Sequence, residues 1–155
     1  MRSTFAEPPM MIPAGAFTVT RPIRFSHSDP AGIVYYPNYF DMFNGLVEDW
    51  FEHELGTRVN ELVFERRLAM PIVHAESDFK VPSRFGEKLN LSLLVERVGR
   101  SSLAYRIVGH VEGEIRLTAR IVTAMISLDT GRAVPIPDAL RERFEAYHSK
   151  CGAAS

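Results

Sequence analysis

The densest group of chemically reactive side chains lies between residues 26 and 32, in the order Ser26-His27-Ser28-Asp29-Pro30-Ala31-Gly32. It supplies the residue types of a hydrolytic triad, but adjacent side chains of an extended segment point to opposite sides and cannot form that relay among themselves. His27 and Asp29 could share one face and bind a metal ion. Because the chain has one cysteine and no repeated histidine spacing, we expect no metal site. A lone carboxylate still serves as a general base or a nucleophile, so Asp29 is the candidate for chemistry.

A predicted helix follows this segment and would position it. Pro37 suits the first turn of a helix, where its missing N–H leaves no bond unmade. Apolar residues then recur at spacings of three and four, at Phe40, Phe43, Val47 and Trp50. Gly56 is a natural end for this helix, and Gly45 in its middle should cost about 1 kcal/mol relative to alanine.

Alternating apolar residues predict strands on both sides of the helix. We expect one strand before it and four after it, at Phe17–Phe25, Pro71–Val81, Leu89–Val95, Leu103–Val111 and Ile115–Leu128. Gly99-Arg100 is typical of a two-residue type II′ hairpin turn. Asp138 can cap a final helix that continues through Tyr147.

This order of elements predicts a single α+β domain, in which one long central helix packs on an antiparallel meander. The domain would cover residues 17–148, between an N-terminal tail at 1–16 and a C-terminal tail at 149–155. One helix covers a sheet face only in part. We therefore expect a homodimer or homotetramer that completes the burial.

Composition narrows the class of function. Eighteen Lys and Arg against nineteen Asp and Glu give a net charge of −1, which argues against nucleic-acid and membrane-surface partners. No apolar run approaches the roughly 20 residues that a bilayer span needs. The first residues contain an acid and two prolines where a signal peptide has an apolar core. We therefore expect a cytoplasmic protein.

The segment that contains Asp29 also carries a family resemblance, through Asp29-Pro30-Ala31-Gly32-Ile33-Val34-Tyr35-Tyr36-Pro37-Asn38-Tyr39-Phe40. It resembles the signature of the 4-hydroxybenzoyl-CoA thioesterase family of hotdog-fold proteins. The resemblance spans about Thr18 to Leu128 and includes Pro71-Ile72-Val73 and the hairpin Gly99-Arg100-Ser101-Ser102. It implies a hotdog fold and an acyl-CoA thioesterase without a metal or organic cofactor.

The resemblance also assigns site residues. Asp29 would be the catalytic carboxylate and the Tyr36 backbone the group that polarises the thioester carbonyl, with Gly32, Pro37 and Ile72 beside the substrate. Coenzyme A would bind near the hairpin of Arg100, Ser101 and Ser102. This chain has one arginine there, flanked by Gly99 and Ser101, whereas related members carry more than one basic residue.

The residue types agree with this chemistry. A thiol of pKa about 8.5 leaves readily as a thiolate, so hydrolysis needs an activated water, or direct attack, and a donor for the oxyanion. A helix N-terminus offers unpaired N–H groups at the positive end of its dipole. Because Pro37 has no N–H, the Tyr36 N–H is the expected donor. Arginine binds phosphates through its planar fork, which favours Arg100 as a coenzyme A ligand.

Other interpretations remain open. Asp29 before Pro30 also suits a purely structural Asx-turn. A hotdog enoyl-thioester hydratase would use Asp29 with His27 as its acid–base pair. A non-catalytic acyl-thioester binding protein would need neither residue for chemistry. The aromatic residues Tyr35, Tyr36, Tyr39 and Phe40 suit an aryl or medium-length acyl group, but packing against the sheet explains them equally well.

Overall fold

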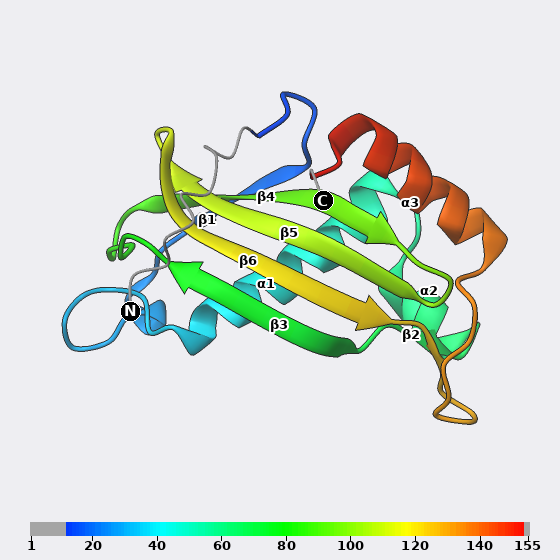
Figure 1. The fold of residues 1–155 in the computed structure, drawn as a ribbon. Helices are drawn as coiled ribbons and strands as arrows, with labels where there is room; N and C mark the ends of the chain where they lie inside the picture. Colours follow the sequence, from blue (N-terminus) through cyan, green and yellow to red (C-terminus); the bar gives the residue numbers. More distant parts are fainter. Residues whose placement is uncertain (1–11, 154–155) are drawn as a thin grey trace, which may run out of the picture.

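The computed structural model describes residues 12–153 and shows a five-stranded antiparallel sheet in the order β1-β4-β5-β6-β3 (Figure 1). The strands are β1 (Thr18–Pro22), β3 (Ile72–Phe79), β4 (Lys88–Val98), β5 (Ser102–Val111) and β6 (Glu114–Ala124). Two short strands, β2 (Leu68–Ala69) and β7 (Ile126–Ser127), form a separate ribbon.

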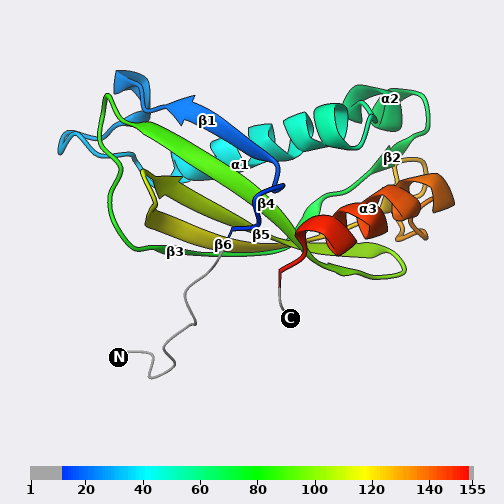
Figure 2. The same ribbon diagram turned by 90° about the horizontal axis from the view of Figure 1, so that it is seen from above.

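One long helix lies across one face of this sheet (Figure 2). It consists of α1 (Pro37–Asp49), which continues as a π-helical turn η2 (Trp50–Glu54) and ends before Gly56, whose φ of 65° suits glycine. A 3₁₀ turn η1 (Phe25–His27) precedes it, and α2 (Val59–Phe64) and α3 (Asp138–Cys151) follow. The core lies between α1 and the sheet, where Phe43, Leu46, Leu91, Leu93 and Ile107 are almost completely buried. The predicted α+β class and the predicted long helix are confirmed.

The sheet differs from the prediction in its connectivity. Only β4, β5 and β6 form a meander, because β3 pairs with β6 and occupies the far edge. The predicted strand Ile115–Leu128 is broken at Met125, whose N–H donates to the Ser101 carbonyl instead of continuing the ladder. Phe25, expected on a strand face, lies in η1 and is 79% exposed. Alternation predicts that a segment is extended, but not which neighbour it pairs with.

The folded part of the chain extends past the expected C-terminal boundary at residue 148. Helix α3 continues to Cys151, which is fully buried, and the Ala153 N–H donates to the Val95 carbonyl at 2.8 Å. Residues 149–153 therefore belong to the folded domain. Of the predicted N-terminal tail, Ala16 packs against the core, and residues 1–11 lie outside the described residues.

Candidate active site

Asp29 lies in a tight hairpin. Its carbonyl accepts the Gly32 N–H and its N–H donates to the Ile33 carbonyl, both at 2.9 Å, while Gly32 has a φ of 77°. This is a three-residue loop whose left-handed position requires glycine. The Ala31 N–H donates to Oδ1 of Asp29 at 2.8 Å, so the Asx-turn is present. No hydrogen bond from another residue within 12–153 reaches Oδ2, which leaves one carboxylate oxygen available.

The hairpin is fixed to the loop that precedes β4. The Val34 N–H donates to the Ser83 carbonyl at 3.0 Å, and the Phe85 N–H donates to the Gly32 carbonyl at 3.1 Å. Both backbone groups of Gly32 are thus used within the protein. Its N–H is not free for a substrate oxygen, so its part in the site is to shape the turn that carries Asp29.

The same hairpin is tied to the start of α1. The His27 carbonyl accepts the Tyr35 N–H at 2.9 Å and the side-chain amide of Asn38 at 2.8 Å. Pro37 occupies the first turn, as predicted. The Tyr36 N–H meets no acceptor among the described residues, and it stands at the positive end of the α1 dipole. The fold therefore brings a carboxylate and an unpaired N–H to the same end of the molecule.

Aromatic side chains surround this helix start. Tyr35 and Tyr36 are 52% and 59% exposed, and their rings are in contact, with centroids 5.5 Å apart. Tyr39 is buried and stacks on Phe79, at the end of β3, with centroids 5.2 Å apart. These rings connect the first turn of α1 to the edge strand.

Ile72 lies at the opposite end of β3 from Phe79. At about 3.3 Å per residue the seven steps between them span roughly 23 Å. Ile72 lines a cavity of about 230 Å³ between α1 and the sheet. Its other walls include Asn44, Val47 and Glu48 of α1 and Leu103, Tyr105 and Thr123 of the sheet. The structure does not bring Ile72 near Asp29 within one chain.

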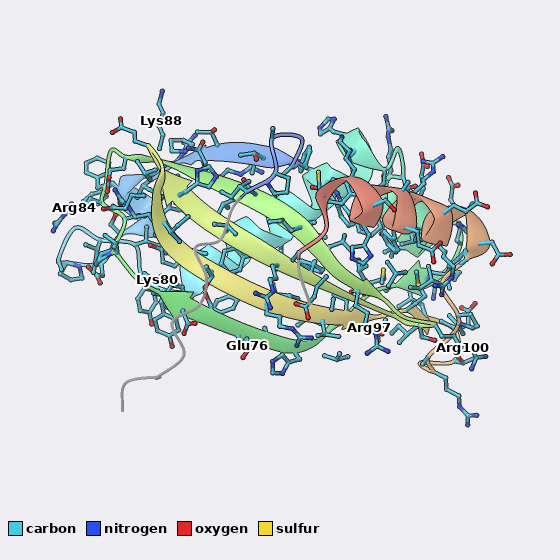
Figure 3. All side chains as sticks on the ribbon, turned by 45° about the horizontal axis from the view of Figure 1, so that its top comes forward. Glu76, Lys80, Arg84, Lys88, Arg97 and Arg100 are labelled. Atoms are coloured by element: carbon cyan, nitrogen blue, oxygen red, sulfur yellow. The ribbon has the colours of Figure 1, made fainter. Side chains whose placement is uncertain are left out.

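The hairpin of Arg100, Ser101 and Ser102 lies at the Ile72 end as well. Ser102 pairs with Ala124, whose N–H donates to the Pro71 carbonyl at 3.1 Å. In Figure 3, Arg100 lies at the opposite end of the sheet from Arg84, and the Asp29 hairpin is fixed to the Arg84 loop. The predicted site residues therefore form two groups, one at each end of the chain's sheet.

The turn itself differs from the predicted type II′ form, because Gly99 has no positive φ. A Cβ on Gly99 would lie 2.5 Å from Oγ of Ser102 and 3.3 Å from its carbonyl oxygen, so a larger residue here would make the Ser102 side chain shift. The turn is held by Arg141 of α3, whose guanidinium donates to the carbonyls of Gly99 and Arg100 at 2.8 and 2.7 Å. The Arg100 side chain is exposed.

No hydrogen bond joins His27 to Asp29 in the described part of the chain. Nδ1 of His27 accepts the Arg24 N–H at 3.0 Å, and Oδ1 of Asp29 accepts the Ala31 N–H, so each makes a hydrogen bond within its own turn. Within residues 12–153, no group of three or more histidine, cysteine or acidic side chains is placed to hold a metal ion.

An ion pair that we did not predict supports the loop beneath Asp29. The guanidinium of Arg116, on β6, donates to both carboxylate oxygens of Glu87 at 3.1 and 2.8 Å, and the Arg84 N–H donates to the same carboxylate. These hydrogen bonds, led by the one from Arg116, hold the pKa of Glu87 below its ordinary 4.5. The signal was an arginine inside a predicted strand, since an arginine that a sheet buries needs a partner.

A sequence model of the Thioesterase-like superfamily matches residues 23–144, which is most of the chain. The chain belongs to this superfamily. A thioester hydrolase is thus confirmed at the level of the superfamily, and the narrower 4-hydroxybenzoyl-CoA thioesterase family stays a prediction. None of the helices that the structure describes is long and apolar enough to span a bilayer.

Two relatives within this superfamily show the extent of the similarity. A 1,4-dihydroxy-2-naphthoyl-CoA hydrolase from Nostoc punctiforme is 29% identical over 114 residues, 74% of this chain and 75% of the relative. One with the same name from Synechocystis is 26% identical over 125 residues, 79% of this chain and 90% of the relative.

Solved structures confirm the hotdog fold. A thioesterase-superfamily protein from Jannaschia aligns with a TM-score of 0.82 at 22% identity and covers 89% of this chain and 96% of its own. A Staphylococcus aureus protein solved in complex with CoA aligns with a TM-score of 0.83 at 16% identity, covering 96% and 92%.

Proposed function

We propose that this chain hydrolyses an acyl-CoA thioester, with an aryl or a short- to medium-chain acyl group, to the free acid and coenzyme A. The observation that carries the proposal is the unpaired Tyr36 N–H at the start of α1, on the segment that also holds the Asp29 carboxylate. The Tyr36 N–H stabilises the oxyanion, and Asp29 activates water or attacks the carbonyl carbon. The departing thiolate needs no metal or organic cofactor.

The exposed edge of β3 supports a dimer. Seven of its eight residues are exposed, and three of these are large and apolar: Ile72, Val73 and Phe79. A strand edge left uncovered tends to pair with another strand. We therefore propose that β3 pairs with the β3 of a second copy, so that the two sheets join.

Such pairing would complete the site. Antiparallel pairing about a two-fold axis places the Ile72 end of one copy beside the Phe79 end of the other. Tyr39 and Tyr36 contact Phe79, so the catalytic end of one chain would face the cavity of its neighbour. The neighbour's Arg100 hairpin would lie at the same end of the joined sheet as Phe79. It would be three strands away from Phe79, at about 4.8 Å per strand, within reach of the nucleotide of coenzyme A.

The proposal is tested by free-thiol release from a panel of acyl-CoA thioesters. We expect hydrolysis of at least one member, and a fall in kcat of roughly 10²–10⁴ for Asp29→Asn, which keeps the turn hydrogen bond. Asp41→Asn, an exposed carboxylate on α1, is the matched control and should stay near wild type. Loss of double-bond absorbance on an enoyl-CoA, without thiol release, would indicate the hydratase instead.

A mixing experiment tests the shared site. Asp29→Asn disables one half, and Ile72→Trp fills the mouth of the cavity in the other half. Co-refolding the two inactive variants should restore about a quarter of wild-type activity, because random pairing makes half the dimers mixed and each mixed dimer has one intact site. No restoration, or an active monomer in sedimentation, would contradict the shared site.

The Asx-turn at Asp29 favours a second interpretation, in which Asp29 is structural and takes no part in hydrolysis. That role predicts Asp29→Asn within a few-fold of wild type in every activity and only a small change in thermal midpoint. Measuring kcat and the thermal midpoint on one preparation of Asp29→Asn separates this interpretation from the catalytic one.

A further inference from the structure

The cavity between α1 and the sheet contains a polar group that the fold does not use. Tyr105 lies on β5, on the face of the sheet that α1 covers, and is only 2% exposed. Its side chain lines the 230 Å³ cavity. Within residues 12–153, no hydrogen bond reaches its hydroxyl group, yet that oxygen is not sealed off as a fully buried atom.

Other buried hydroxyls in the same region have partners. The hydroxyl of Tyr147 accepts the Phe17 N–H at 2.9 Å and donates to the Leu93 carbonyl at 2.6 Å. Thr123, which also lines the cavity, donates to the Leu103 carbonyl at 3.3 Å. Buried tyrosine hydroxyls normally find such partners, so a free one in a cavity wall indicates a ligand atom.

The rest of the cavity suits an apolar ring. Apart from Tyr105 and Thr123, the walls are largely apolar, with Val47, Phe51 and Ile72 among them, and the polar Asn44 and Glu48 are exposed. A cavity of about 150 Å³ holds benzene, so 230 Å³ accommodates a ring with a substituent. Burial raises the pKa of Tyr105, which keeps the phenol protonated and able to donate.

We propose that Tyr105 is a specificity-determining residue, whose hydroxyl donates a hydrogen bond to an oxygen substituent on the distal part of the acyl group. The cavity then selects ring-sized acyl groups that carry a hydroxyl, carbonyl or ether oxygen over their deoxy counterparts. This inference rests on the proposed thioesterase function for the identity of the ligand as an acyl-CoA.

The test compares pairs of aryl-CoA thioesters that differ by one ring oxygen, in wild type, Tyr105→Phe and Tyr147→Phe. Wild type should favour the oxygenated member by roughly 5- to 100-fold in kcat/KM, since the deoxy member leaves the hydroxyl unpaired. Tyr105→Phe should bring that ratio close to one without lowering the thermal midpoint. Tyr147→Phe should lower the midpoint and leave the ratio unchanged, because its hydroxyl bonds to the protein itself.

Titration calorimetry with non-hydrolysable thioether analogues of the same pairs separates this inference from the function. Preferential binding of the oxygenated analogue, lost in Tyr105→Phe, supports the role of Tyr105 even if no thioester is hydrolysed. Hydrolysis with an unchanged ratio in Tyr105→Phe overturns it. So does a loss of stability in Tyr105→Phe equal to that in Tyr147→Phe, or binding of neither analogue.

Discussion

Tyr39 of α1 stacks on Phe79 at the end of β3, with ring centroids 5.2 Å apart and planes inclined by 21°. Phe79 also contacts the ring of Tyr36 at 6.5 Å. Through these two contacts the last residue of the edge strand fixes the helix turn that presents the Tyr36 N–H. The edge strand and the turn that carries the proposed oxyanion donor are therefore held together by these ring contacts.

Phe79→Ala should weaken the packing of β3 against the start of α1. Loss of the aromatic contacts and of the ring's burial should destabilise the fold by about 1–2 kcal/mol and lower kcat more than it raises KM. Urea unfolding and steady-state hydrolysis measure the two effects. Phe64→Ala, on α2 and 76% exposed, is the control and should stay within about 0.5 kcal/mol of wild type. Equal effects of both substitutions would argue against a positioning role for Phe79.

Arg100→Ala tests the coenzyme A site. Phosphate contacts are remote from the reacting carbonyl and similar in ground and transition states, so KM for acyl-CoA should rise more than kcat falls. Arg97→Ala, at the same end of the sheet in Figure 3, is the matched control. Hydrolysis of a truncated pantetheine thioester should be unaffected by both substitutions. If Arg100→Ala lowers that hydrolysis as much as it lowers hydrolysis of acyl-CoA, Arg100 does not bind phosphate.

The ion pair of Glu87 and Arg116 should make stability depend on pH in the acid range. The pKa of Glu87 is lower in the folded than in the unfolded protein, where it is near 4.5, so its contribution is complete above that pH and is lost as the pH falls below it. In wild type, the urea midpoint should therefore decrease from neutral to acid pH. In Glu87→Gln this decrease should be smaller. Glu112→Gln, in the exposed turn between β5 and β6, should reproduce the wild-type profile.

Gly45→Ala should stabilise the protein. A Cβ at Gly45 meets only Nη2 of Arg21, at an ordinary 3.6 Å, and its φ is not positive, so the gain in helix propensity of about 1 kcal/mol is available. Calorimetry should show a rise of roughly 2–4 °C in Tm. Gly109→Ala should do the reverse, because its Cβ would lie 2.7 Å from Cγ of Leu117. A lower Tm for Gly45→Ala would mean that α1 needs glycine at this position.

The sequence predicted those features that depend on neighbours along the chain. Pro37 and Gly56 bound the long helix because one lacks an N–H and the other adopts a positive φ. The position of β3 beside β6 was missed, since a pleated strand reads the same at an edge as in the centre. Cys151 was assigned to a tail because the residues around it are polar, and its burial follows from the packing of α3 on β4, where Gly152 is bridged to Val95.

Within the site, local and distant residues divide in the same way. Asp29, Tyr36 and Pro37 lie in one continuous segment, so their proximity follows from the sequence. That Ile72 and Arg100 lie at the other end of the sheet follows from strand order, which the sequence does not state. Tyr105 lies inside the predicted strand Leu103–Val111, where the alternating pattern did not single it out. Its unused hydroxyl is visible only once the cavity is known.

Trp50 is the chain's single tryptophan, and it is fully buried where η2 meets α3, stacked on Phe144 at 5.7 Å and in edge contact with Phe51. The protein thus carries one intrinsic fluorophore in an apolar aromatic cluster, on the helix that leads away from Asp29. Its emission should lie at short wavelength and shift to the red when α3 detaches. Phe51, which contacts Trp50, also lines the 230 Å³ cavity, so the emission should report both unfolding and the filling of that cavity.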